Sequence, residues 1–235
     1  MKYSFDARVG YSEISDEGYM KAGSVIDRFQ DCSNFQSESL GVGWEYLSGI
    51  NRVWVLNSWQ IIFDKQMKMG DNIKVSTWAY GFDKLFGYRN FMITDEKGEK
   101  CVRAASRWVL IDPKTMRPLK ISPQDVEMYE TEDKLEMEYG KRKIAVPEDL
   151  SVKENIKVRR YQIDTNGHMN NAWYVKIAME YIENKKNVRQ LRAEYRKSAV
   201  ISDIIRVKVH SENNNSIVVL CDEKDAIYSI VEFEF

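Results

Sequence analysis

Hydrophobic positions along the chain change their spacing several times, and each change predicts a different element. Between residues 21 and 40, apolar residues such as Val25, Ile26 and Phe29 recur three and four positions apart, which is the spacing of one buried helix face. Gly41 follows at a position where a helix commonly ends. We therefore expect a helix over residues 21–40.

From residue 53 the apolar period falls to two, as in β-strands. The alternating residues form three runs: Trp59, Ile61 and Phe63, then Ile73, Val75 and Thr77, then Ser106, Trp108 and Leu110. Turn residues separate these runs at Gly70-Asp71, at Gly81 and at residues 95–98. This spacing predicts an antiparallel meander.

The second half of the chain repeats the same order of patterns. An apolar stripe predicts a second helix over residues 170–184, with Trp173, Ile177, Ala178, Tyr181 and Ile182 on one side. Strand patterns follow at residues 189–199, 204–210, 217–222 and 226–235. Each half therefore reads as strand, helix and meander.

A comparison of the halves at an offset of 149 residues supports an internal duplication. It pairs Val9 with Val158, Ile14 with Ile163, Gly18 with Gly167 and Met20 with Met169, each set just before a predicted helix. Together with the shared order of elements, these matches predict two similar packed halves.

Length and charge fit an ordinary globular protein. The chain has 235 residues, 43% of them hydrophobic, and a formal net charge of −1, so a basic nucleic-acid-binding surface is not indicated. Acidic residues are concentrated between positions 121 and 150. We predict an N-terminal domain over residues 1–122, an acidic connector over residues 123–150 and a C-terminal domain over residues 151–235.

Cysteine usage and the amino terminus suggest a compartment. Cys32, Cys101 and Cys221 are odd in number and far apart, which argues against disulfides and zinc and for free buried thiols. The first ten residues lack the apolar stretch of a signal peptide, and no apolar run is long enough for a membrane helix. We expect a soluble cytoplasmic protein without membrane insertion, metal or organic cofactor.

Two histidines limit the search for a general base. His210 ends a strand pattern beside a polar turn and is interpreted as structural. His168 lies in the segment Asp-Thr-Asn-Gly-His-Met-Asn-Asn over residues 164–171, just before the second predicted helix. A turn followed by a helix cap would explain part of this segment, but a cap needs one such polar residue and the segment holds six.

The residue types in this segment suit hydrolysis of an activated acyl group. His168 can relay a proton near neutral pH, and Asp164 can orient it, act as a base or attack directly. Asn166 can donate a hydrogen bond to a carbonyl or fix a water molecule. Backbone amides around Gly167 and Met169, at the start of the helix, could stabilise an oxyanion.

Four segments together resemble the bacterial relatives of the plant acyl-acyl carrier protein thioesterases. They are DTNGHMNN, RAASRWVLIDPKTMRPLKI, MGDNIKVSTWAYGF and YSEISDEGYMKAGSVIDRFQDCS. The resemblance spans nearly the whole chain. It implies an α+β fold of the tandem double hotdog type, in which each half wraps an antiparallel sheet around a long central helix. It also implies hydrolysis of fatty acyl-acyl carrier protein, which ends fatty acid synthesis.

The resemblance assigns the family's catalytic Asp, Asn and His to Asp164, Asn166 and His168. The family's fourth residue, a Glu, is replaced here, because the matching strand places Ser198 at that position. Glu194 lies four residues away and is not an obvious substitute. Ser198 can hold a water molecule or bind His168, but it lacks the charge and proton affinity of a carboxylate.

The first half has a different predicted task. The positions matching the catalytic residues at the same offset are Ser15, Glu17 and Tyr19, so the chemistry is present once. By resemblance the N-terminal hotdog supplies the acyl-chain pocket. It holds five of the six tryptophans, Trp44, Trp54, Trp59, Trp78 and Trp108.

Acyl carrier protein is acidic, so a basic docking surface is expected. The residues predicted for it lie around the end of the second helix and the next strand: Lys185, Lys186, Arg189, Arg192, Arg196 and Lys197. A solvated helix end is the alternative interpretation. Rival functions are an acyl-coenzyme A thioesterase, a low-activity acyl-binding protein and a hotdog dehydratase or hydratase, and a homodimer is left open.

Overall fold

The structure is a computed structural model that describes residues 1–141, 143–183 and 185–235, except for the side chain of Lys186. The chain forms two compact units. Unit 1 contains Met1–Asn57 and Phe63–Tyr139, and unit 2 contains Ser58–Ile62 and Gly140–Phe235. The break between the units along the chain, at residues 139 and 140, lies inside the segment predicted as an acidic connector.

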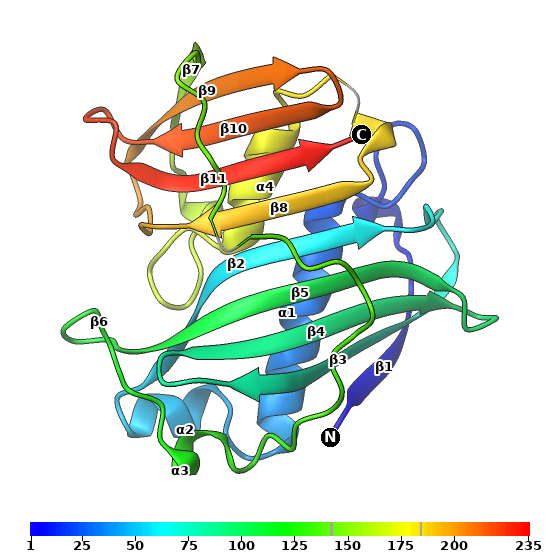
Figure 1. Cartoon of the computed structure of the whole chain (residues 1–235), viewed down its shortest axis with the longest axis vertical. Coiled ribbons are helices and arrows are strands. Elements are labelled where there is room, and N and C mark those ends of the chain that lie inside the picture. The colour runs from blue at the N-terminus through cyan, green and yellow to red at the C-terminus, as the bar shows by residue number, and fades with distance from the viewer. Residues whose placement is uncertain (142, 184) are drawn as a thin grey trace. The chain divides into compact units, whose positions relative to one another are not determined.

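Unit 1 is an antiparallel sheet with one long helix on one face. Its strands pair in the order β1, β3, β4, β5, and the short β6 pairs with β5. The elements are β1 (Tyr3–Arg8), α1 (Ala22–Ser39), α2 (Trp44–Gly49), β2 (Val53–Phe63), β3 (Asn72–Phe82), β4 (Phe86–Asp95), β5 (Lys100–Asp112), β6 (Arg117–Pro118) and α3 (Pro123–Val126). In Figure 1, α1 lies behind β3, β4 and β5.

The predicted first helix is confirmed as α1. Val25, Ile26 and Phe29 are fully buried, and the Phe29 ring lies 5.0 Å from that of Phe91 on β4. Burial of a side chain of this size stabilises a fold by about 1.5–3 kcal/mol relative to exposure. The helix stops at Gly41, whose φ of 72° is the left-handed conformation that glycine adopts without strain.

A buried arginine joins α1 to the sheet. Arg89 on β4 donates from both terminal nitrogens to the side-chain oxygen of Gln36 on α1, at 2.7 and 2.5 Å. It also donates to the Thr77 hydroxyl at 3.2 Å and lies 5.3 Å from the centre of the Tyr129 ring. Burial lowers the pKa of Arg89. Its two hydrogen-bond acceptors within the described residues, the Gln36 side-chain oxygen and the Thr77 hydroxyl, are neutral groups.

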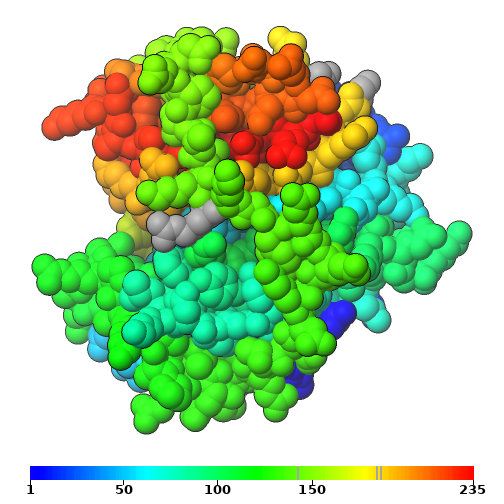
Figure 2. Space-filling model, viewed as in Figure 1, coloured from blue at the N-terminus to red at the C-terminus, as the bar shows by residue number. Residues whose placement is uncertain are grey.

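The acidic segment crosses the opposite face of the unit 1 sheet (Figures 1 and 2). Asn90 on β4 has no exposed surface, and its side chain bonds the Leu135 amide at 3.0 Å and the Tyr139 hydroxyl at 2.9 Å. Trp78 on β3 donates to the Asp133 carbonyl at 2.8 Å. Residues 130–139 are thus an ordered strap on this face.

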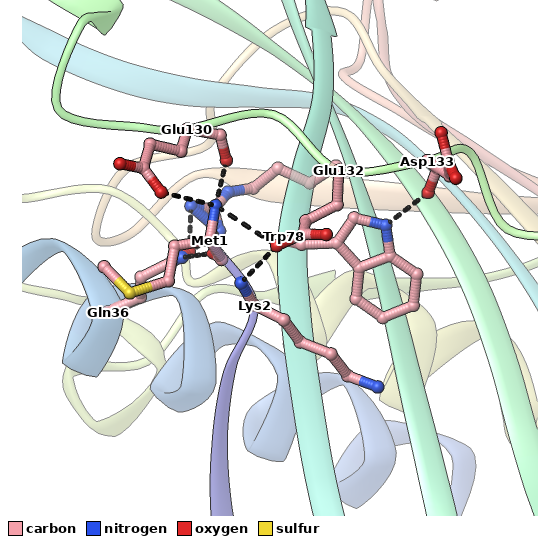
Figure 3. A network of polar contacts seen from close by, with 8 residues as sticks. Met1, Lys2, Gln36, Trp78, Glu130, Glu132 and Asp133 are labelled. Atoms are coloured by element: carbon pink, nitrogen blue, oxygen red, sulfur yellow. Dashed lines mark hydrogen bonds and ion pairs between the residues drawn. The ribbon is translucent and has the colours of Figure 1, made fainter.

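The first residues of the chain meet this strap (Figure 3). The Met1 ammonium group bonds the Glu130 carbonyl and lies 3.5 Å from the Glu132 carboxylate. The Lys2 amide donates to the Glu132 carboxylate at 3.2 Å, and Gln36 donates to the Met1 carbonyl at 2.8 Å. The same Gln36 side chain therefore binds both Arg89 and the start of β1.

Unit 2 repeats this plan with a shorter helix. Its strands pair in the order β2, β8, β11, β10, β9, β7, with residues 58–62 as the β2 part. The elements are β7 (Ser151–Lys157), α4 (Asn171–Met179), β8 (Gln190–Tyr195), β9 (Ile204–Glu212), β10 (Asn215–Cys221) and β11 (Ile227–Glu234). In Figure 1, α4 lies behind β8, β11 and β10.

The second helix is shorter than predicted. It ends at Met179, and the Glu180 and Tyr181 amides bond carbonyls three residues back, which tightens the chain into a turn. Ile182 is only 3% exposed, so the apolar stripe that extended the predicted helix is buried by this turn instead. The predicted end at residue 184 falls outside the described residues.

Two strand details also differ from the prediction. Gly81 lies inside β3 at a register shift, and the turn comes at Asp83, whose side chain accepts two backbone amides. The predicted strand over residues 189–199 stops at Tyr195. The Arg196 and Lys197 backbone amides both donate to the Tyr228 carbonyl, at 2.8 and 3.3 Å, so the regular strand pairing of β8 with β11 ends there.

The three cysteines are buried and unpaired, as predicted. Burial raises the pKa of the Cys32 thiol to about 12. Within the described ranges, no helix is both long and apolar enough to span a bilayer.

Candidate active site

The segment predicted to carry chemistry forms a tight turn in unit 2. The Gly167 amide donates to the Asp164 carbonyl at 3.1 Å, and the Asp164 amide donates to the His168 carbonyl at 2.8 Å. Gly167 has a φ of 76°, which favours glycine. Asn170 then caps α4 by accepting the Ala172 amide at 2.9 Å.

The three predicted catalytic residues therefore lie on one short turn. One oxygen of the Asp164 carboxylate accepts hydrogen bonds from two backbone amides, that of Asn166 at 2.8 Å and that of His168 at 3.4 Å. Asp164 and His168 are half-buried, and Asn166 is exposed. Among the described residues, no hydrogen bond joins the three side chains to one another, so the turn places them close together without locking them.

Unit 1 contains the same turn, 149 residues earlier. The Gly18 amide donates to the Ser15 carbonyl at 3.0 Å, and the Ser15 amide donates to the Tyr19 carbonyl at 2.8 Å. Gly18 has a φ of 83°. An isolated bridge pairs Ile14 with Met20, as one pairs Ile163 with Met169 in unit 2. These hydrogen bonds show that both halves contain the same turn, as the predicted repeat implies.

The turn in unit 1 shows which features are needed for folding and which side chains are not. Ser15, Glu17 and Tyr19 occupy the positions of Asp164, Asn166 and His168, with the same order of half-buried, exposed and half-buried side chains. Because the backbone hydrogen bonds are the same, the turn itself does not require an Asp, an Asn and a His. The presence of those residue types in unit 2 therefore favours a chemical role.

The two backbone amides predicted to stabilise an oxyanion already have acceptors. Gly167 donates to Asp164 within the turn, and Met169 donates to the Ala199 carbonyl at 2.8 Å. An amide bound in this way offers little to a substrate oxygen. The side-chain amide of Asn166, which is exposed, is the better donor in this structure.

Ser198 lies in the loop after β8, beside the turn. It is exposed. The carbonyl of the next residue, Ala199, accepts a hydrogen bond from the Met169 backbone amide. The Ala199 amide donates to the Tyr174 hydroxyl of α4 at 2.8 Å. Asp203 closes the same loop by accepting the Val200 amide at 3.0 Å. The residues that directly follow Ser198 in this loop are thus held by hydrogen bonds.

Tyr174 supports the turn, a role that was not predicted from the sequence. The pKa of Tyr174 is raised to about 12, mainly by burial and also by the negative charges of Asp164 and Asp203, while the hydrogen bond from the Ala199 amide lowers it. The hydroxyl therefore stays neutral, and the Asp164 carboxylate acts on it electrostatically. Its position three residues before Ile177 and four before Ala178, on the apolar side of the predicted helix, was the available signal.

Glu194 is occupied elsewhere. It is 8% exposed on β8 and accepts the Arg196 guanidinium at 2.8 Å and the Ile144 amide at 3.0 Å. Burial raises the pKa of Glu194, but these hydrogen bonds and the charges of Arg196 and Lys143 outweigh it and hold the pKa below its usual range. Glu194 is therefore a structural carboxylate in this geometry.

The basic residues predicted to dock a carrier are largely paired with acids. Arg189 is exposed and has no carboxylate partner among the described residues. The side chain of Lys186 lies outside the described part. The other four make ion pairs, Lys185 with Glu180 at 3.1 Å, Arg192 with Glu232 at 2.7 Å, Arg196 with Glu194 at 2.8 Å and Lys197 with Asp222 at 2.9 Å.

The tryptophans of the predicted acyl pocket lie in different surroundings. Trp44 on α2 is 59% exposed, and Trp78 lies under the strap of residues 130–139. Trp59 is 2% exposed and belongs to the β2 segment of unit 2. Trp54 lies 6.4 Å from Phe82 between ring centres, and Trp108 donates to the Ser106 hydroxyl at 2.7 Å. The acyl pocket stays a prediction.

The described residues contain no group of three His, Cys, Asp or Glu side chains placed to hold a metal ion.

Comparison with solved structures defines the fold. An acyl-ACP thioesterase from Bacteroides thetaiotaomicron matches with a TM-score of 0.91 at 20% identity, over 100% of this chain and 97% of that one. A 12:0-ACP thioesterase from Umbellularia californica matches with a TM-score of 0.88 at 17% identity, over 99% and 96%. The chain therefore has the α+β double hotdog fold, as predicted, although the helix of unit 2 is short.

Comparison of the sequence then defines the family. Residues 1–129 match the acyl-ACP thioesterase N-terminal domain, and residues 146–228 match the C-terminal domain. The chain belongs to the acyl-ACP thioesterase family.

Two plant proteins show how far this similarity extends. A chloroplastic palmitoyl-acyl carrier protein thioesterase from Arabidopsis thaliana is 27% identical over 63% of this chain. A chloroplastic acyl-[acyl-carrier-protein] hydrolase from Cuphea viscosissima is 27% identical over 83% of it. The matched parts make up 38% and 52% of those proteins, so the chain spans about half of their length or less.

Proposed function

We propose that this chain hydrolyses the thioester between a fatty acyl group and acyl carrier protein, which releases the fatty acid and terminates its synthesis. Family membership over both halves supports this reaction class. The observation that supports assigning this reaction to particular residues is the turn found in both units. Only its second copy holds Asp164, Asn166 and His168, although both copies fold alike.

The turn supplies three groups that the reaction needs. His168 takes a proton from the attacking water as the water oxygen bonds to the thioester carbon. Asn166 donates its side-chain amide to the carbonyl oxygen as that oxygen becomes negative. The carbon–sulfur bond then breaks, and the proton passes to the leaving thiolate. Direct attack by Asp164, with water resolving the resulting anhydride, is the alternative route.

Asp164 also has a positioning task. One of its oxygens is held by the amides of Asn166 and His168, so the carboxylate ties the two neighbouring catalytic residues to one backbone geometry. Ser198 lies at the position of the family's Glu, in the loop that Met169 and Tyr174 hold against the turn. We assign it a water-holding role, which needs a hydroxyl and no charge.

The test is thiol release from a panel of acyl carrier protein thioesters of increasing chain length and from matching acyl-coenzyme A thioesters. Preferred turnover of the carrier substrates is expected, with an optimum that reports the length of the acyl pocket. Preference for coenzyme A would contradict the carrier assignment. Acyl binding without turnover would establish the acyl-binding alternative.

The two glycines of the duplicated turn provide a matched pair of variants. A Cβ atom at either glycine would meet nothing within 4 Å, so an alanine costs only backbone strain, about 1–2 kcal/mol at a positive φ. Gly167→Ala and Gly18→Ala should therefore destabilise the protein alike. Gly167→Ala should also lower kcat/KM about tenfold, because the turn positions His168.

Thermal unfolding and thiol release measure both effects. Equal losses of activity in the two variants would contradict the assignment of the site to the second turn. Gly167→Asn provides a further control, since Asn tolerates the left-handed conformation better than Ala and should recover part of both losses.

A further inference from the structure

A basic and aromatic surface precedes the catalytic turn in unit 2. Its residues belong to the stretch from the end of β7 to the short 3-10 helix at residues 160–162 and to the first turns of α4. We call it the 157–176 patch, and it consists of Lys157, Arg159, Arg160, Tyr161, Trp173 and Lys176.

The basic side chains of the stretch are open to a partner. Lys157, Arg159 and Arg160 are exposed and have no carboxylate partner among the described residues. Val158 between them is 1% exposed, and its amide donates to the Asp203 carbonyl at 2.9 Å. The backbone is thus anchored at one buried residue while the charged side chains around it reach solvent.

The aromatic part is an exposed ring against a second ring. Tyr161 is 71% exposed and lies 5.2 Å from Trp173 between ring centres in an edge-on arrangement. The Lys176 ammonium lies 4.8 Å from the centre of the Trp173 ring. Aromatic and cationic side chains held together in this way are typical of protein docking surfaces.

Unit 1 does not repeat the patch. At the offset of 149 residues, Lys176 corresponds to Asp27, Trp173 to Ser24 and Arg160 to Tyr11. One basic residue remains, Arg8 at the position of Lys157, and its guanidinium donates to the Gly70 carbonyl at 2.8 Å. The patch therefore accompanies the copy of the turn that carries Asp164, Asn166 and His168.

We infer that the 157–176 patch is the docking surface for acyl carrier protein, an inference that rests on the proposed function. A carrier must present its acyl thioester at the catalytic turn, and Tyr161 lies three residues before Asp164. The carrier is acidic, and Lys157, Arg159 and Arg160 offer positive charge without a carboxylate partner among the described residues, beside an aromatic centre. The cluster predicted from sequence is less suitable, because four of its members already pair with acids.

The experiment measures binding, so that it does not depend on hydrolysis. The probe is acyl carrier protein whose acyl chain is attached through an amide in place of the thioester. Its Kd is measured by calorimetry for the full chain and for Arg160→Glu, with Lys224→Glu as a control of equal charge change at an exposed turn. Arg160→Glu should raise Kd about tenfold at low salt, and Lys224→Glu should leave it within about twofold.

Salt and a second variant separate the two parts of the patch. The effect of Arg160→Glu should shrink as salt is raised, since the screening length falls to about 3 Å at 1 M. Tyr161→Ala should raise Kd at both salt concentrations, because an apolar contact is not screened. Should Arg160→Glu fail to fold, Arg160→Gln carries the same test with an expected rise of about threefold.

Two results would overturn the inference, and a third would overturn only the proposed function on which it rests. An unchanged Kd in Arg160→Glu would overturn the inference, and a raised Kd in Arg189→Glu would then move docking to the cluster predicted from sequence. If Arg160→Glu raised the Kd of an acyl-phosphopantetheine amide without the carrier by the same factor, Arg160 would contact the phosphopantetheine group and not the carrier protein. A wild-type chain that binds the carrier without hydrolysing its thioester would contradict the proposed function and leave the docking surface intact.

Discussion

Replacement of His168 by alanine is expected to lower kcat for the acyl carrier protein thioester by about 100-fold to 10,000-fold. In the proposed reaction the imidazole takes the proton from the attacking water and returns it to the leaving thiolate. The fold should persist, since the His168 backbone, which makes the turn hydrogen bonds, is unchanged. The measurement is thiol release under saturating substrate, with thermal unfolding of the same sample.

Tyr19→Ala is the matched control, because Tyr19 occupies the same place in the first copy of the turn. It should leave kcat within about twofold of the unmodified chain. Near-normal turnover in His168→Ala would remove His168 from the reaction. A large loss in Tyr19→Ala would show that the first turn also contributes to catalysis.

Replacement of Gln36 by leucine is expected to lower the free energy of unfolding by about 3 kcal/mol. Gln36 accepts both terminal nitrogens of the buried Arg89. Without that oxygen, the partners of the guanidinium among the described residues are the Thr77 hydroxyl and the Tyr129 ring. A buried charge deprived of its hydrogen-bond partner is among the costliest changes a fold can undergo. Urea unfolding, monitored by tryptophan fluorescence, measures the loss.

Two further variants test the cause of this loss. Gln36→Leu combined with Arg89→Met should be more stable than Gln36→Leu alone, because removal of the charge removes the uncompensated group. Asn34→Leu, at an exposed position of the same helix, should change stability by about 0.5 kcal/mol at most. A loss below about 1 kcal/mol in Gln36→Leu would contradict the electrostatic explanation.

Periodic apolar patterns predicted the elements well where packing continues along one face. The helix expected over residues 21–40 is α1, Ala22–Ser39. This prediction succeeded because the apolar spacing and the terminating Gly41 are both features of the local sequence. The helix expected over residues 170–184 ends at Met179, because Ile182 reaches the core through a turn that periodicity does not distinguish from helix.

The closeness of the three predicted catalytic residues follows from the sequence, but the hydrogen bonds around them do not. Residue types place Asp164, Asn166 and His168 together, whereas the engagement of the Met169 amide depends on Ala199, 30 residues away in the chain. Two ion pairs of the basic cluster depend in the same way on distant acids, Arg192 on Glu232 and Lys197 on Asp222. Contacts between distant segments require the fold and have no local signal.

The duplicated turn has a consequence for how such a protein can change over time. Both copies fold through the same backbone hydrogen bonds and a glycine at positive φ, to which the Asp164 carboxylate adds two hydrogen bonds in the second copy. The turn therefore forms with different side chains at its three variable positions. A duplicated gene segment then provides one copy that retains reactive groups and another in which the same positions can be altered at little risk. The first turn of this chain is a ready site for introducing new chemistry by design.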